Sequence, residues 1–77
     1  MRRNRGLPRG VSMDPDDVLY KDGLPIGRVI ETPPGLGLWM ALAKTRSYGS
    51  MDEVAKALPS KDAAIHAALE HSRAYWA

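Results

Sequence analysis

Alternating apolar and polar positions between residues 18 and 45 predict three antiparallel β-strands. Turn-forming residues separate the strands: Asp22-Gly23 is a strong signal for a tight hairpin, and the Pro-Pro-Gly segment at 33–37 indicates a longer loop. The strands are expected at "VLY" (18–20), "LPIGRVIET" (24–32) and "LWMALAKT" (38–45). Because short turns join antiparallel neighbours, this part of the chain is predicted to be a β-meander.

Two residues interrupt the second predicted strand. Pro25 has no amide proton for a sheet hydrogen bond, so it belongs at the start of the strand or on an outward-facing edge. Gly27 indicates a β-bulge, or a place where a large side chain such as Trp39 lies across the backbone.

The third predicted strand has two different faces. One carries Leu38, Met40 and Leu42, and the other carries Trp39, Ala41 and Ala43. Both faces are at least half apolar. We therefore expect the sheet to be covered on one side and partly used on the other, although the pattern does not say which side is exposed.

The second half of the chain has helical signals. "SMDE" (50–53) matches a capping box, which predicts a first helix over 51–58. Pro59 would end that helix, and Ser60 would cap a second one running from Lys61 to about Tyr75. Asp52, near the positive end of the first helix dipole, favours the same interpretation.

Helical spacing in the second predicted helix defines a buried stripe. Its members are Ile65, Ala68, Leu69, Ser72 and Trp76. We expect Trp76 to pack back on the sheet, beside Trp39 and under the meander. The predicted structural core is Ile26, Val29, Ile30, Trp39, Val54, Leu58, Ile65, Leu69 and Trp76.

These elements predict an α+β mini-domain over 13–77, a three-stranded antiparallel β-meander packed against two short C-terminal helices (β-β-β-α-α). A chain of 77 residues buries only about 60% of the surface that it exposes when unfolded. The apolar set is lean, with ten alanines and no phenylalanine, and the absence of cysteine excludes disulfides and thiolate zinc sites. A protein partner or a second copy of the chain is a reasonable source of additional stability.

Basic charge is concentrated in residues 1–12, which hold four arginines and no acid, whereas residues 13–77 are slightly acidic. This segment is rich in Arg, Gly and Pro and is expected to be a disordered basic arm. It could contact phosphates, or it could be a solvated tail, with Met13 as an alternative start of the natural product. The candidate nucleic-acid-binding residues are Arg2, Arg3, Arg5, Arg9, Arg28, Lys44 and Arg46.

An enzymatic function finds little support in the sequence. His66, Glu70 and His71 form the one cluster with ligand or acid–base chemistry, and two ligands on a helix do not make a metal site. The chain has no G-x-S-x-G elbow and no Walker-type lysine, and its Gly-rich segments lack a dinucleotide fingerprint. We therefore expect no catalytic residues, no metal and no cofactor.

The segments "DGLPIGRVIE", "LWMAL" and "SMDEVAKAL" resemble those of small bacterial proteins with a D-G-x-x-V-G-R-I hairpin, a Trp-bearing strand and an Ala-rich C-terminal helix. The resemblance covers roughly 18–58 and implies a β-β-β-α core without implying an activity. This chain departs from it at Ala41, where a second aromatic usually follows Trp39, and in its two expected helices. A topological likeness extends to the small DNA-binding domains of certain plant transcription factors and phage-type integrases, and topology does not define function.

Three function classes follow from these observations. A non-catalytic protein-interaction module, with self-association as one form of it, ranks first, nucleic-acid binding through the arm and the sheet second, and an enzyme last. The chain has no uninterrupted apolar run long enough for a membrane span and no signal-peptide pattern, so we expect a soluble cytoplasmic protein without membrane contact.

Overall fold

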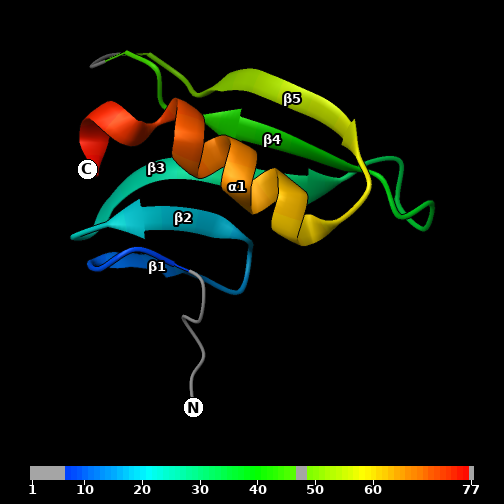
Figure 1. Cartoon of the computed structure of the whole chain (residues 1–77), viewed down its shortest axis with the longest axis horizontal. Coiled ribbons are helices and arrows are strands. Elements are labelled where there is room, and N and C mark those ends of the chain that lie inside the picture. The colour runs from blue at the N-terminus through cyan, green and yellow to red at the C-terminus, as the bar shows by residue number, and fades with distance from the viewer. Residues whose placement is uncertain (1–6, 47–48, 77) are drawn as a thin grey trace.

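The computed structural model describes residues 7–46 and 49–76. Within them, five strands form one antiparallel sheet in the order β1-β2-β3-β4-β5, and a helix crosses one face of it (Figure 1). The strands are β1 (Val11–Met13), β2 (Val18–Lys21), β3 (Leu24–Glu31), β4 (Trp39–Ala43) and β5 (Asp52–Leu58), and they are followed by α1 (Lys61–His71) and the short 3₁₀ turn η1 (Arg73–Tyr75).

The predicted architecture of three strands and two helices is wrong. Strands β2, β3 and β4 occupy the three segments where strands were expected, but the segment predicted as a first helix is strand β5, which pairs with β4. Strand β1 is also additional, and it pairs with β2 and covers the last two residues of the predicted arm. One α-helix and a 3₁₀ turn then follow in the described chain.

The error at β5 has a physical cause in its irregular pairing. The register between β4 and β5 shifts twice, and Ala57 adopts a left-handed φ of 57°. The resulting bulges bring Val54, Ala55 and Leu58 to the same core. Their spacing imitates a helical stripe, although pairing with β4 determines the conformation.

The turn at Asp22-Gly23 is a tight hairpin, as the sequence predicts, with φ of 52° and 88° at its two residues. The pairing of β2 with β3 then shifts between Leu19 and Tyr20, so Ile26 is the extra residue of a β-bulge. This bulge lies at the position that Gly27 indicated. Both Ile26 and Gly27 are buried.

Gly27 allows α1 to approach the sheet closely. A Cβ atom built on Gly27 would lie 3.2 Å from the Cβ of Ala68 on α1 and 3.0 Å from the carbonyl oxygen of Leu42 on β4. Such contacts are tighter than nine in ten of those that real Cβ atoms make, so a side chain at position 27 would require its neighbours to shift by a few tenths of an ångström. The neighbour of Gly27 is therefore the helix, and not Trp39 as one of the sequence-based alternatives had it.

The core lies between the sheet and α1. Its buried members are Val11, Leu19, Ile26, Val29, Ala41, Ala64, Ala68 and Leu69. Among the predicted core residues, Trp39, Val54, Leu58, Ile65 and Trp76 are partly buried and pack against this cluster. Ile30 lies on the other face of the sheet, because it alternates with buried Val29 along β3.

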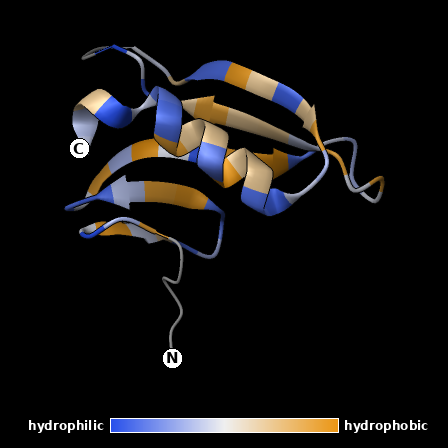
Figure 2. Cartoon of the chain, in the orientation of Figure 1, coloured by the Kyte–Doolittle hydropathy of each residue, from blue (hydrophilic) through white to orange (hydrophobic). Residues whose placement is uncertain are grey.

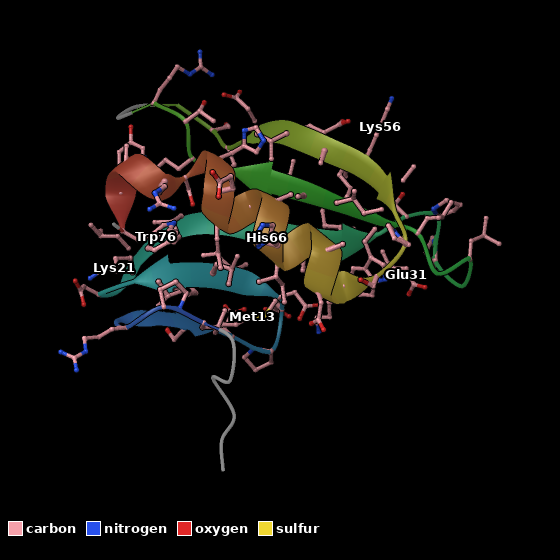
Figure 3. All side chains as sticks on the ribbon, in the orientation of Figure 1. Met13, Lys21, Glu31, Lys56, His66 and Trp76 are labelled. Atoms are coloured by element: carbon pink, nitrogen blue, oxygen red, sulfur yellow. The ribbon has the colours of Figure 1, made fainter. Side chains whose placement is uncertain are left out.

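The two tryptophans lie at opposite ends of α1 and not side by side as expected. The Lys61 ammonium at the start of the helix lies 5.8 Å from the centre of the Trp39 ring. The Trp76 indole N–H donates a 2.7 Å hydrogen bond to the carbonyl oxygen of Leu69, near the helix end (Figure 3). Each ring thus packs at one end of the interface between α1 and the sheet.

Side chains also define where α1 begins and ends. As predicted, the Ser60 hydroxyl caps the helix by accepting a 3.0 Å hydrogen bond from the Ala63 amide. At the other end, the buried Ser72 hydroxyl donates a 2.7 Å hydrogen bond to the Ala68 carbonyl. An ion pair of 2.8 Å between Lys61 and Asp17 connects the start of α1 to the turn before β2.

Gly27→Ala is expected to lower the free energy of unfolding by about 1–3 kcal/mol, because the added methyl overpacks the contact with α1. In an Ala68→Gly background the same substitution should cost less, since one of the two clashing groups is gone. Urea unfolding of the wild type, both single variants and the double variant measures this difference. An equal cost of Gly27→Ala in both backgrounds would show that α1 does not lie against Gly27.

Candidate interaction face

The face of the sheet away from α1 carries a second set of apolar side chains. Strand register places Val18, Arg28, Leu42 and Glu53 in one transverse row across β2, β3, β4 and β5. Ile30 and Met40 form a neighbouring pair. We call this surface, made of Val18, Tyr20, Arg28, Ile30, Met40, Leu42 and Glu53, the open face.

No described helix or strand covers the open face. The helix α1 contacts β3, β4 and β5 from the other side, and the residues after it pack against the same core (Figure 1). The Cα atoms extend 34 × 32 × 18 Å, and the short dimension has room for only one sheet and one helix layer. None of the apolar residues of the open face belongs to the core cluster.

The open face is apolar along β4 and carries a charged residue on each of the two neighbouring strands. Val18, Ile30, Met40 and Leu42 are half-buried, because neighbouring strands shield part of each side chain, whereas Arg28 and Glu53 are exposed. Figure 2 shows that β3 carries both apolar and charged residues along its length. Leu42 on β4 therefore lies between a cation on β3 and an anion on β5, with Ile30 and Met40 as an apolar pair beside this row.

The turn before β2 limits one end of the open face and orders Tyr20. The Asp14 carboxylate accepts hydrogen bonds of 2.9 Å from the amides of Asp16 and Val18 and one of 3.1 Å from the Tyr20 hydroxyl. The Val18 hydrogen bond is the main reason that the pKa of Asp14 lies below its usual value, and Arg28 contributes by charge. The hydrogen bond from the Tyr20 hydroxyl to the Asp14 carboxylate is the main reason that the pKa of Tyr20 lies above its usual value.

The predicted nucleic-acid-binding residues are dispersed where the structure describes them. Arg28 is on the open face, Lys44 lies 5.6 Å from the centre of the Tyr75 ring, and Arg46 forms a 3.0 Å ion pair with Asp52. Arg9 is exposed just before β1. Arg2, Arg3 and Arg5 lie outside the described residues.

The histidine cluster lies on the outer surface of α1, far from the open face. His66, Glu70 and His71 are all exposed, and Figure 3 shows His66 midway along the helix. Within residues 7–46 and 49–76, no group of three potential ligand side chains is arranged to hold a metal ion.

Large exposed apolar side chains lie at the two ends of β3. Leu24 is 69% exposed at the hairpin, and Leu36 and Leu38 are 66% and 37% exposed in the loop that follows β3. This loop is held by the Gly37 amide, which donates a 3.0 Å hydrogen bond to the Glu31 carboxylate.

In comparisons with known proteins, no protein-family model, no curated protein and no solved structure matches the chain. The resemblance to small bacterial proteins therefore stays a likeness of local pattern. Among the described helices, none is long and apolar enough to cross a membrane.

Sequence reasoning identified the two faces of β4 but not which of them is open. The signal was side-chain size. On β4 the small Ala41 and Ala43 face the helix, whereas the larger Met40 and Leu42 lie on the open face. Glu53 was missed because its segment was predicted to be helical.

The depressed pKa of Asp14 predicts a specific loss of stability in acid. The folded chain favours the ionised carboxylate, so this stabilisation is present above about pH 4 and disappears as the pH falls through the lower folded-state pKa. The gap in unfolding free energy between wild type and Asp14→Asn should therefore be largest near neutrality and shrink below about pH 4. Urea titrations from pH 7 to pH 2.5 measure it, with Asp16→Asn as the control for removal of a nearby charge.

A wild-type to Asp14→Asn gap that stays constant, or widens, over this acid range would contradict the assignment of Asp14 as the carboxylate that holds the turn.

Proposed function

We propose that this chain is a non-catalytic protein-interaction module and that the open face is its binding surface. The observation that carries the proposal is the sheet face bearing Ile30, Met40 and Leu42, which has no covering layer among the described elements. A one-sided sheet commonly has a polar outer face, whereas this one is apolar over its central strands. A partner that covers the open face removes apolar surface from water.

Binding through the sheet edges has less support. Strand β1 has three residues, which is short for the addition of a further strand. Strand β5 is longer, but its two register shifts, the left-handed Ala57 and exposed Lys56 are features that oppose edge pairing. The face is therefore the better candidate for recognition.

Nucleic-acid binding remains the alternative that the sequence raised, and the described surface favours it less. Arg28 shares its row with Glu53, so the open face does not offer a run of cations to phosphates. Arg46 is already paired with Asp52. Support for this alternative would have to come from residues 1–6.

The remaining parts of the proposal follow the sequence analysis. The module acts without catalytic residues or cofactor, and it works in the cytoplasm. The dispersed polar chemistry of the described surface, with His66 and Glu70 exposed on the far side of α1, is in keeping with a binding role.

Site-specific photo-cross-linking in the native host tests the function. A photoreactive amino acid in place of Leu42, at the centre of the open face, should give discrete adducts with protein. The same group in place of His66, on the outer surface of α1, is the matched control and should give none. The adducts from position 42 should also disappear when Met40→Lys is introduced beside it.

Equal adduct patterns from positions 42 and 66, or no adduct from either, would overturn the assignment of the open face as a binding surface. Circular dichroism of each variant establishes that it is folded before the patterns are compared.

A further inference from the structure

We propose that the partner of the open face is a second copy of this chain, which packs face to face in a symmetric dimer. This inference rests on the proposed function and adds the identity of the partner. It is carried by the order of side chains in the transverse row, where Leu42 on β4 lies between Arg28 on β3 and Glu53 on β5.

The order of this row is self-complementary under a two-fold rotation. Arg28 and Glu53 each lie one strand spacing, about 4.8 Å, from Leu42 on opposite sides. A two-fold axis that runs along β4 and passes over Leu42 exchanges these two positions between the copies. Arg28 of each copy then faces Glu53 of the other, and the two contacts are identical by symmetry.

Arg28 and Glu53 can each form an ion pair with the second copy. Arg28 and Glu53 are both exposed, and no ion pair joins them within the described part of one chain. Asp14 lies close enough to Arg28 to be affected by its charge, but it is already occupied as an acceptor for two amides and the Tyr20 hydroxyl. Each copy therefore offers one cation and one anion at matching distances from the axis.

Apolar contacts fill the centre of the same arrangement. Leu42 and Met40 are on β4, so both meet their own counterparts across the axis, and Ile30 flanks them from β3. Methionine adapts its shape readily, which suits a contact with an identical side chain. The charged residues then flank Leu42 on both sides within the same row.

The size of the face indicates a weak dimer. Three or four strands at about 4.8 Å spacing and about 20 Å in length cover on the order of 400 Å² per copy. This is below the roughly 800 Å² per partner of a typical stable complex and belongs to the weak, transient class. We therefore expect a dissociation constant on the order of 10–100 µM.

Charge exchange on the full chain, followed by sedimentation equilibrium from 5 to 500 µM, tests the dimer. Arg28→Glu and Glu53→Arg each place two like-charge pairs in the homodimer and should weaken it roughly tenfold. An equimolar mixture of the two variants restores both opposite-charge pairs, so it should associate more tightly than either variant alone. The double variant Arg28→Glu/Glu53→Arg should return to the wild-type range.

Glu70→Arg, on the outer surface of α1, makes the same charge change as Glu53→Arg and should leave the association unchanged. Thermal unfolding at low concentration separates loss of fold from loss of association.

The result that would overturn the dimer is a wild-type chain that stays monomeric up to 500 µM, or single variants that are weakened without recovery in the mixture. If the chain is monomeric while position 42 still cross-links to a different protein, the second copy is excluded and the interaction module stands. If neither occurs, both proposals fail. A salt-dependent complex with duplex DNA that Arg28→Glu abolishes would assign the face to nucleic acid instead.

Discussion

The packing of α1 on the sheet depends on the close contact between Gly27 and Ala68. Absence of a Cβ at Gly27 lets the helix approach the backbone of β3, with the carbonyl of Leu42 beside it. On β4 the side chains that face the helix are small: Ala41 and Ala43 are both fully buried, and the larger Leu19, Ile26 and Val29 of β2 and β3 complete the buried face. The buried alanines Ala41, Ala43, Ala64 and Ala68 are thus suited to a close helix–sheet contact.

The two faces of β4 differ in side-chain size, with alanines towards α1 and larger residues on the opposite side. Along β3 and β4, the positions that alternate with the covered ones carry Ile30, Met40 and Leu42. The same register aligns Arg28 and Glu53 on either side of Leu42. On β4, small residues thus pack against the helix, and larger apolar residues face the proposed partner on the opposite side.

The predictable elements were those in which local pattern and pairing agree. Asp22-Gly23 defines its hairpin by turn chemistry, and Ser60 caps α1 by a side-chain hydrogen bond, so both can be recognised from neighbouring residues alone. Strand β5 could not, because its bulges depend on contacts with β4 and break the two-residue period that identifies a strand. Strand β1 is three residues long and is defined by pairing with β2, which carries almost no local signal.

The candidate site was likewise predictable only where local pattern was sufficient. Alternation identified Met40 and Leu42 as neighbours on one face, but the choice between the two faces required the position of α1. The row that contains Arg28 and Glu53 could be recognised only once β5 was known to be a strand. Long-range pairing, and not residue type, thus decides where the charges of the open face lie.

Nuclear Overhauser contacts of the Ala68 methyl group test the central claim, that α1 covers the small-residue face, most directly. The structure predicts strong contacts from this methyl to the α protons of Gly27, and none to the side chains of Met40 or Leu42. Contacts from Ala68 to Met40 or Leu42 would show that the helix lies on the other face. The open face would then not exist as described.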